Sequence, residues 1–205
     1  MMFQLTELQH DALVEIFNLG VGQAAAAMSR IVNEEVTMSV PMIAFQSRAD
    51  VAKTLGSDEG RRICAIAQHF EGAFNTEAFL MFPEEKSLEI VRLMVGQSLT
   101  LDELGEMEQE AMSEIGNIIL NACMGSFANA SGNELQGSLP IYHVGTCDNI
   151  LGSSGKEWDG VVLTLKIDFN IERHHIYGYV AFLLDMSALH DLQHYIDDYL
   201  AKLTG

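Results

Sequence analysis

The chain has 205 residues, with 11 Lys or Arg against 29 Asp or Glu, and its formal net charge at pH 7 is -18. Proteins that bind nucleic acid or anionic membranes neutralise phosphates with clustered cationic side chains, and this chain has too few of them for either role. Hydrophobic residues make up 48% and charged residues 20%. This composition predicts a globular protein with a substantial core and excludes a disordered chain.

The cysteines and the first residues bear on the compartment. Cys64, Cys123 and Cys147 are odd in number and form no CxxC pair, which argues against a disulfide framework or a zinc cage. The start of the chain lacks the basic and apolar regions of a signal peptide, and no stretch reaches the ~18 uninterrupted apolar residues that span a bilayer. We therefore expect a cytoplasmic protein without membrane insertion.

The first half of the chain predicts a helix, a strand, a short helix, two strands and a helix, in that order. Pro41 interrupts the first strand, which indicates an edge position or a bulge because proline cannot donate to a ladder. Gly20 and Gly22 predict a kink or close packing in the first helix. The predicted elements are residues 6–32, 36–45, 49–55, 62–70, 73–82 and 84–95.

The second half repeats this order. Its predicted elements are a helix over 106–130, a strand with a proline over 137–144, a Gly/Ser-rich loop over 152–155, a hairpin of 161–171 and 175–184, and a helix over 186–203. Sliding residues 11–41 over 110–140, an offset of 99, gives seven identities that include Pro41 and Pro140 without a gap. The pattern indicates an internal duplication.

The predicted fold is α+β, a single pseudo-two-fold domain over residues 1–205 whose repeat halves cover approximately 1–100 and 101–205. Each half alone would expose the apolar faces of its strands and helices, so the halves should pack on one another. We expect a mostly antiparallel sheet flanked by two long site-bearing helices and shorter helices.

Each long helix carries a polar triplet. At about 100° per residue, Asp11, Glu15 and Asn18 lie within about 60° of one another, opposite an apolar face. The second helix repeats the triplet as Glu110, Glu114 and Asn117, so that the two triplets together give six candidate site residues. A solvated helix face or shared ancestry explains such a pattern as well, but asparagine is a mediocre residue within a helix, and its recurrence suggests a task for the carboxamide.

The chemistry of that task follows from the residue types. A carboxamide offers two donors and an acceptor and does not titrate near neutral pH, so it positions a water and does not act as a base. The glutamate one turn away can form a charge-assisted hydrogen bond with a cationic group on a partner.

The pattern Asp11-x3-Glu15-x2-Asn18-x22-Pro41, repeated as Glu110-x3-Glu114-x2-Asn117-x22-Pro140, resembles the signature of the CheC/CheX/FliY family of chemotaxis phosphatases. Two copies in one chain of this length are most like the two-site CheC branch. Glu110 departs from the Asp or Ser that the family usually has at this position.

The resemblance implies hydrolysis of the aspartyl phosphate on a CheY-like response regulator. Asn18 and Asn117 would orient the attacking water, Glu15 and Glu114 would pair with the receiver's lysine, and Asp11, Pro41, Glu110 and Pro140 would support them. The receiver would supply Mg²⁺, so that no intrinsic cofactor or metal is expected. The alternative is a binding module that docks on a receiver or on a CheD-like receptor deamidase with little turnover.

Other motifs are weaker. His190 and His194 have helical spacing but lack the Glu of a zinc-binding HExxH, which favours a surface helix over a metal site. The cysteines have no neighbour that would activate a thiol, and residues 172–175 are typical of a polar hairpin turn.

Overall fold

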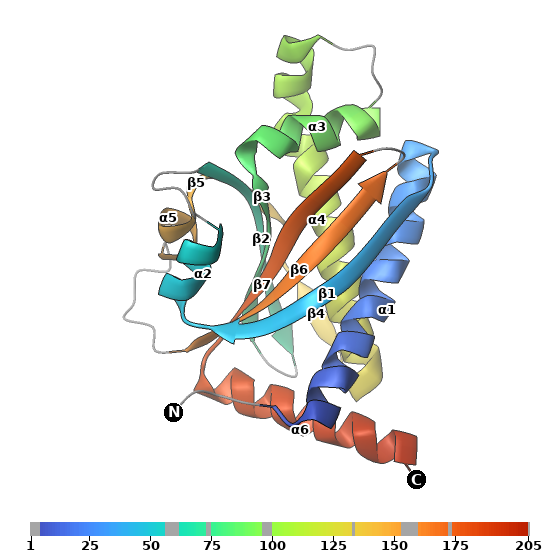
Figure 1. The fold of residues 1–205 in the computed structure, drawn as a ribbon, viewed down its shortest axis with the longest axis vertical. Coiled ribbons are helices and arrows are strands. Elements are labelled where there is room, and N and C mark those ends of the chain that lie inside the picture. Colours follow the sequence, from blue (N-terminus) through green and yellow to red (C-terminus); the bar gives the residue numbers. More distant parts are fainter. Residues whose placement is uncertain are drawn as a thin grey trace.

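Helices and strands follow the same order twice along the chain in the computed structural model (Figure 1). The structure describes residues 5–55, 62–72, 75–95, 100–132, 134–152, 160–171 and 174–204. The first half contains α1 (Glu7–Val32), β1 (Val36–Gln46), α2 (Arg48–Leu55), β2 (Arg62–Gly72), β3 (Thr76–Pro83) and α3 (Glu84–Val95). The second contains α4 (Leu101–Ser131), β4 (Leu135–Gly137), β5 (Ile141–Thr146), α5 (Cys147–Gly152), β6 (Val161–Ile171), β7 (His174–Leu184) and α6 (Met186–Thr204).

The seven strands form one sheet in the order β1-β6-β7-β3-β2-β4, with β5 also paired to β2, and every described pair is antiparallel. Counted inward from one edge the strands are β1, β6 and β7, and counted inward from the other they are β4 with β5, β2 and β3. Each strand thus corresponds to its equivalent in the other repeat. The two halves are interleaved in the sheet: β3 pairs with β7 at the centre, β1 of the first half pairs with β6 of the second, and β2 of the first half pairs with β4 and β5 of the second. These features confirm the predicted α+β fold with pseudo-two-fold symmetry and a mostly antiparallel sheet.

Both edge strands are interrupted at their proline. The register between β1 and β6 shifts around Pro41, while β4 ends at Gly137 and β5 begins at Ile141, on either side of Pro140. Proline has no N–H for the ladder, so it is tolerated at an edge and at an irregularity. The prediction of an edge position or a bulge at Pro41 is confirmed on both counts.

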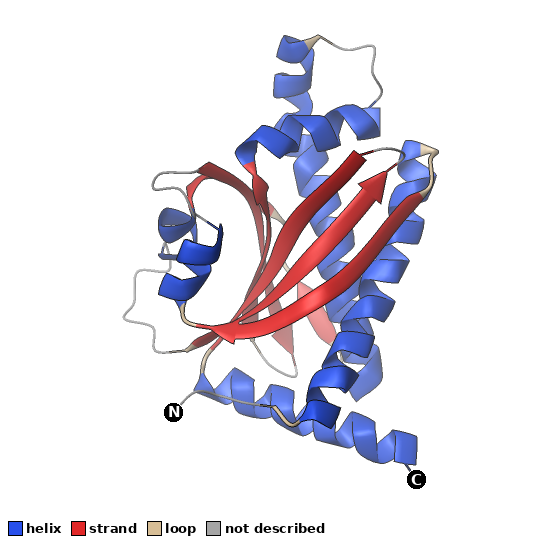
Figure 2. Ribbon diagram, in the orientation of Figure 1, coloured by secondary structure: helices blue, strands red, loops and turns tan. Residues whose placement is uncertain are grey.

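The long helices α1 and α4 run in opposite directions side by side over one face of the sheet (Figures 1 and 2). Gly20 permits their closest approach, because a Cβ there would lie 2.8 Å from the backbone oxygen of Ala122, whereas a Cβ at Gly22 would meet open space. Of the two predicted explanations for Gly20, close packing is therefore the correct one.

The ends of the two helices follow from local sequence. Thr6 and Thr100 both form capping boxes, in which each threonine side chain accepts the backbone N–H three residues on. At the other ends, Asn33 and Gly132, which the offset of 99 relates, adopt left-handed conformations with φ of 54° and 76°. The cap at Thr100 also explains why α4 begins at Leu101, earlier than the predicted start at residue 106.

The second face of the sheet is covered in part by the short helices α2 and α5, which pack together over a smaller core that includes Val51 and Leu151. Helix α5 was not predicted, because six residues are too few to show a helical period. Residues 153–155 of the predicted loop, residues 73–74 of a predicted strand and residues 172–173 of the predicted turn lie outside the described part of the chain.

Helix α1 is long and apolar enough to cross a membrane by length and composition, and it is the one such helix in the described part of the chain. Half of its most apolar 18-residue window is buried within the fold. Leu13 and Val21, for example, are fully buried in the main core. This is the pattern of a core helix, and it is weak evidence for a membrane span.

Candidate functional site

The first polar triplet lies on the outer side of α1. Asp11 and Glu15 are exposed and Asn18 is half-buried, whereas Leu13 and Phe17 on the opposite side are buried in the core. The helical spacing predicts this division, because residues three and four apart share a face. The Glu15 carboxylate has no ion-pair partner among the described residues and is available to a partner molecule.

Asn18 is held from the side of the sheet. The backbone N–H of Val40 donates a 3.0 Å hydrogen bond to Asn18 Oδ1. Val40 immediately precedes Pro41 and lies between Ser39 and Met42, where the register of β1 against β6 shifts. The bond fixes the orientation of the carboxamide, since only its oxygen can accept from a backbone N–H. Pro41 thus lies next to the residue whose backbone N–H holds the asparagine.

The second triplet has the same placement on α4. Glu110 and Glu114 are exposed and Asn117 is half-buried, opposite the buried Met112 and Ile115. Among the described residues, the Glu114 carboxylate has no cationic partner, and the same is true of the Glu15 carboxylate.

The surroundings of Asn117 differ from those of Asn18. The side-chain amide of Asn121, one turn further along α4, donates to Asn117 Oδ1 at 2.8 Å and to the Asn117 backbone oxygen at 2.7 Å. Asn121 also approaches Gln68 Oε1 at 3.4 Å, and Gln68 Nε2 donates to the backbone oxygen of Ser138 at 2.7 Å. A chain of amides thus links Asn117 to the interrupted edge strand.

Val40, Gln68 and Asn121 were not among the predicted site residues. Val40 acts through its backbone, which no side-chain pattern reveals. Gln68 and Asn121 are signalled only by comparing the halves at the offset of 99, where their counterparts are the apolar Ile167 and Gly22.

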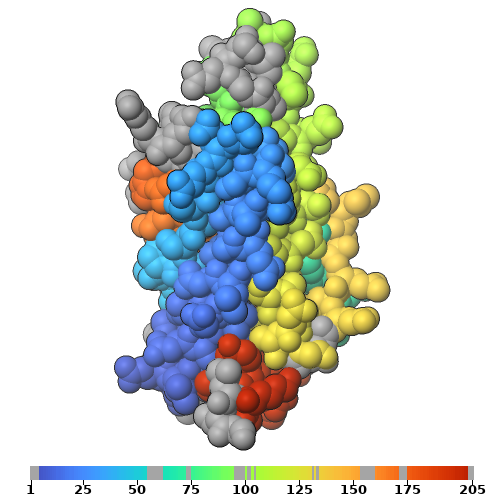
Figure 3. Space-filling model, turned by 90° about the vertical axis from the view of Figure 1, so that its right-hand side faces the viewer, coloured from blue at the N-terminus to red at the C-terminus, as the bar shows by residue number. Residues whose placement is uncertain are grey.

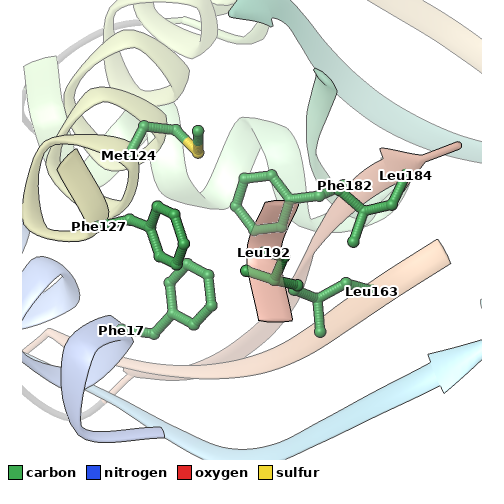
Figure 4. Close-up of a pocket in the computed structure, with 7 residues that line it drawn as sticks. All are labelled: Phe17, Met124, Phe127, Leu163, Phe182, Leu184 and Leu192. Carbon is green, nitrogen blue, oxygen red and sulfur yellow. The ribbon is translucent and has the colours of Figure 1, made fainter. Parts of the chain in front are cut away.

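Figure 3 shows the face of the molecule on which α1 and α4 lie next to each other. The two triplets thus belong to an exposed helical surface, because Asp11, Glu15, Glu110 and Glu114 are all exposed. The pocket in Figure 4 is of another kind. It lies between the helices and the sheet and is lined by seven apolar side chains, among which Phe17 stacks on Phe182 with ring centroids 5.5 Å apart. With no polar group in its lining, this pocket is a gap in the core and offers no chemistry.

The remaining candidates offer no reactive group. His190 and His194 lie exposed on α6 with ring centroids 5.0 Å apart, and the described residues contain no cluster of three potential metal ligands. Burial raises the pKa of each cysteine thiol to about 12, so the thiols stay protonated at neutral pH. Tyr142 contributes a hydrogen bond to Cys64 that acts in the opposite direction but is the smaller effect.

Comparison with known proteins gives consistent relatives. Over 139 residues the chain is 27% identical to "CheY-P phosphatase CheC" of Bacillus subtilis, covering 66% of each protein. Over 128 residues it is 27% identical to "Flagellar motor switch phosphatase FliY" of the same organism, covering 62% of this chain and 32% of FliY. The matches therefore span less than two thirds of either relative. No family model matches the chain.

Solved structures show the same fold. FliY of Thermotoga maritima superposes with a TM-score of 0.74 and 17% identity, covering 96% of this chain and 100% of that one. CheX in a CheX-CheY-BeF3-Mg complex from Borrelia burgdorferi superposes with a TM-score of 0.52 and 16% identity, covering 84% of this chain and 98% of that one.

The structure is an α+β fold of two repeats, with one exposed glutamate and one half-buried asparagine of the repeated motif on each long helix. In sequence the chain is similar to CheC and FliY, and its fold is similar to those of FliY and CheX.

Proposed function

We propose that this chain hydrolyses the aspartyl phosphate of a phosphorylated CheY-like receiver domain at two sites, one on α1 and one on α4. The observation that carries the proposal is the repeated arrangement of an exposed glutamate and, one turn away, an asparagine whose carboxamide a second group holds in place. The name of the B. subtilis relative, a CheY-P phosphatase, and the CheX-CheY complex of a structural neighbour support the choice of substrate.

The asparagine supplies position. With Asn18 Oδ1 bonded to Val40 N–H, the two Nδ2 hydrogens and the second lone pair of Oδ1 can hold a water beside the phosphoryl group. The water oxygen attacks phosphorus in line, the bond from phosphorus to the receiver's aspartate breaks, and the carboxylate leaves with the electron pair. The water's protons pass to the phosphate and to solvent. Positioning of this kind can contribute several kcal/mol to the rate.

The glutamate supplies docking. Glu15 and Glu114 would each accept a charge-assisted hydrogen bond from the lysine of the receiver's own active site. The receiver supplies Mg²⁺, which neutralises the phosphoryl oxygens together with that lysine. This division needs no metal site and no cationic cluster on this chain, in keeping with its net charge of -18.

Phosphate release tests the proposal. A receiver phosphorylated with a small phosphodonor in Mg²⁺ is mixed with the parent protein, Asn18→Ala, Asn117→Ala or the double variant, and inorganic phosphate is followed over time. We expect the parent to accelerate release, each single variant to retain part of the acceleration, and the double variant to lose it. A double variant as fast as the parent would refute water positioning by these residues.

The same experiment separates the rival function. A regulatory binding module would bind the phosphorylated receiver stably and leave its phosphate lifetime unchanged. Titration calorimetry with the BeF3-activated receiver, run beside the phosphate assay, gives the binding arm of the comparison.

A further inference from the structure

The two sites hold their asparagines with different donors. In the first site the donor is the backbone N–H of Val40, at 3.0 Å from Asn18 Oδ1. In the second site it is the side chain of Asn121, at 2.8 Å from Asn117 Oδ1. Leu139 is the counterpart of Val40 at the offset of 99, but Val40 is 3% exposed and Leu139 is 85% exposed. The residue that precedes the proline is therefore buried in the first site and exposed in the second.

Two side chains of the second site also differ from their counterparts in the first. Gln68, which replaces the core residue Ile167 of the other half, is buried at 2% exposure, and its amide holds the backbone oxygen of Ser138. Asn121 replaces Gly22 and reaches both Gln68 and Asn117. The second site thus has two polar residues, Gln68 and Asn121, at positions whose counterparts at the offset of 99 are an apolar residue and a glycine.

The hydrogen-bond partners determine which side-chain atoms of Asn121 and Asn117 are nitrogen and which are oxygen. The Asn117 backbone oxygen can only accept, so the atom of Asn121 that lies 2.7 Å from it must be the donor Nδ2. The neighbouring atom of the Asn117 side chain, 2.8 Å from the same Nδ2, must then be an acceptor, because two NH₂ groups would repel each other. In both sites, therefore, Oδ1 receives the bond from the protein and Nδ2 is left for the reaction.

We infer that Asn121 is the positioning residue of the second site and that it replaces the backbone donor of the first. This inference rests on the proposed phosphatase function. Asn121 acts through Asn117, and its loss should lower turnover without weakening the docking of the receiver.

The kinetic test isolates the second site in the Asn18→Ala background. Asn121→Leu removes the donors at similar size, and Asn121→Asp keeps the shape but presents oxygen atoms in place of Nδ2. Both should lower kcat about ten- to a hundredfold with KM unchanged, which is the scale of losing orientation in a near-attack geometry. Asn129→Leu, at an exposed asparagine two turns further along α4, is the matched control and should retain the parent kcat.

The structural test follows the Asn117 side-chain amide by ¹H–¹⁵N NMR, with signals assigned by their loss in Asn117→Ala. In Asn121→Asp the Asn117 carboxamide should turn so that an Nδ2 hydrogen bonds the new carboxylate, which shifts that hydrogen downfield and slows its exchange. Asn129→Leu should leave the spectrum of Asn117 unchanged.

The outcomes decide between the two hypotheses separately. Unchanged kcat and unchanged Asn117 signals in both Asn121 variants would overturn the positioning role, and so would a raised KM at unchanged kcat, which would assign Asn121 to receiver docking. If the Asn18→Ala protein releases no phosphate, the proposed activity of the second site fails, and the NMR experiment still decides whether Asn121 orients Asn117.

Discussion

The N–H of Val40 and Oδ1 of Asn18 connect the first site helix to the interrupted edge strand through a 3.0 Å hydrogen bond. This bond gives Asn18 two roles that can be separated. As an acceptor it satisfies a backbone donor of β1, and as a donor it is available to a water. Different substitutions remove one role or both.

Asn18→Asp and Asn18→Ala should therefore have the same effect on activity and different effects on stability. Asp retains an acceptor for Val40 N–H, so its free energy of unfolding should stay close to that of the parent. Ala leaves the N–H unpaired and should cost about 1 kcal/mol. In the Asn117→Ala background, both should abolish the remaining phosphate release. Urea unfolding and the phosphate assay measure the two effects, and equal stability of the two variants would contradict the role of the hydrogen bond.

Glu114→Gln should raise KM for the phosphorylated receiver in the Asn18→Ala background with little change in stability, because the carboxylate is exposed. Its remaining binding should also depend less on salt, since the lost interaction is between charges that ions screen. Glu106→Gln, at another exposed glutamate of α4, is the control for net charge. Equal KM values for the two variants over the same salt series would show that Glu114 contributes only to the general field.

Two glycines of the site helices should respond oppositely to alanine. A Cβ at Gly116 would collide with the Ile66 side chain, whereas one at Gly22 would meet no atom within 4 Å. Gly116→Ala should lower the free energy of unfolding by about 1–3 kcal/mol through overpacking of α4 against β2. Gly22→Ala should raise it by up to about 1 kcal/mol, because alanine loses less backbone entropy in a helix. Thermal or urea unfolding of this pair measures both signs.

The cysteines should be inert in the native protein. Burial raises the pKa of Cys64, Cys123 and Cys147 to about 12, so a thiol reagent at pH 8 should label none of them until urea unfolds the chain. The folded pKa lies above the unfolded value near 9. The contribution to stability is therefore complete below about pH 9 and declines as the pH rises toward 12. Fast labelling of the folded protein would contradict the burial.

The long helices and the strands were predictable from sequence because their hydrophobic patterns continue over long segments and the chain contains few prolines. The spacing of Glu15 and Asn18 also fixes which way the triplet faces, since the opposite side of the helix is uniformly apolar. The irregularity in β1 was predictable because Pro41 has no backbone N–H to donate to a neighbouring strand.

The amide chain of the second site was not predictable in the same way. Gln68 lies 53 residues before Asn121, and the packing of α4 on β2 brings the two side chains together. The direction of a carboxamide depends on partners that folding assembles, one of which is a backbone N–H. A comparison of the two halves at fixed offset indicates where they differ, although it does not reveal what the differences do.

The pairing of strands from different halves, such as that of β3 with β7, determines how the sites on α1 and α4 can be studied separately. The halves exchange backbone hydrogen bonds between β1 and β6, between β3 and β7, and between β2 and both β4 and β5. Separating the halves after a cut between α3 and α4 would therefore leave unpaired strand edges on both of them. Neither half is expected to fold stably on its own. We therefore expect both proposed sites to require the intact sheet, so that one of them can be removed only by changing its side chains on an intact chain.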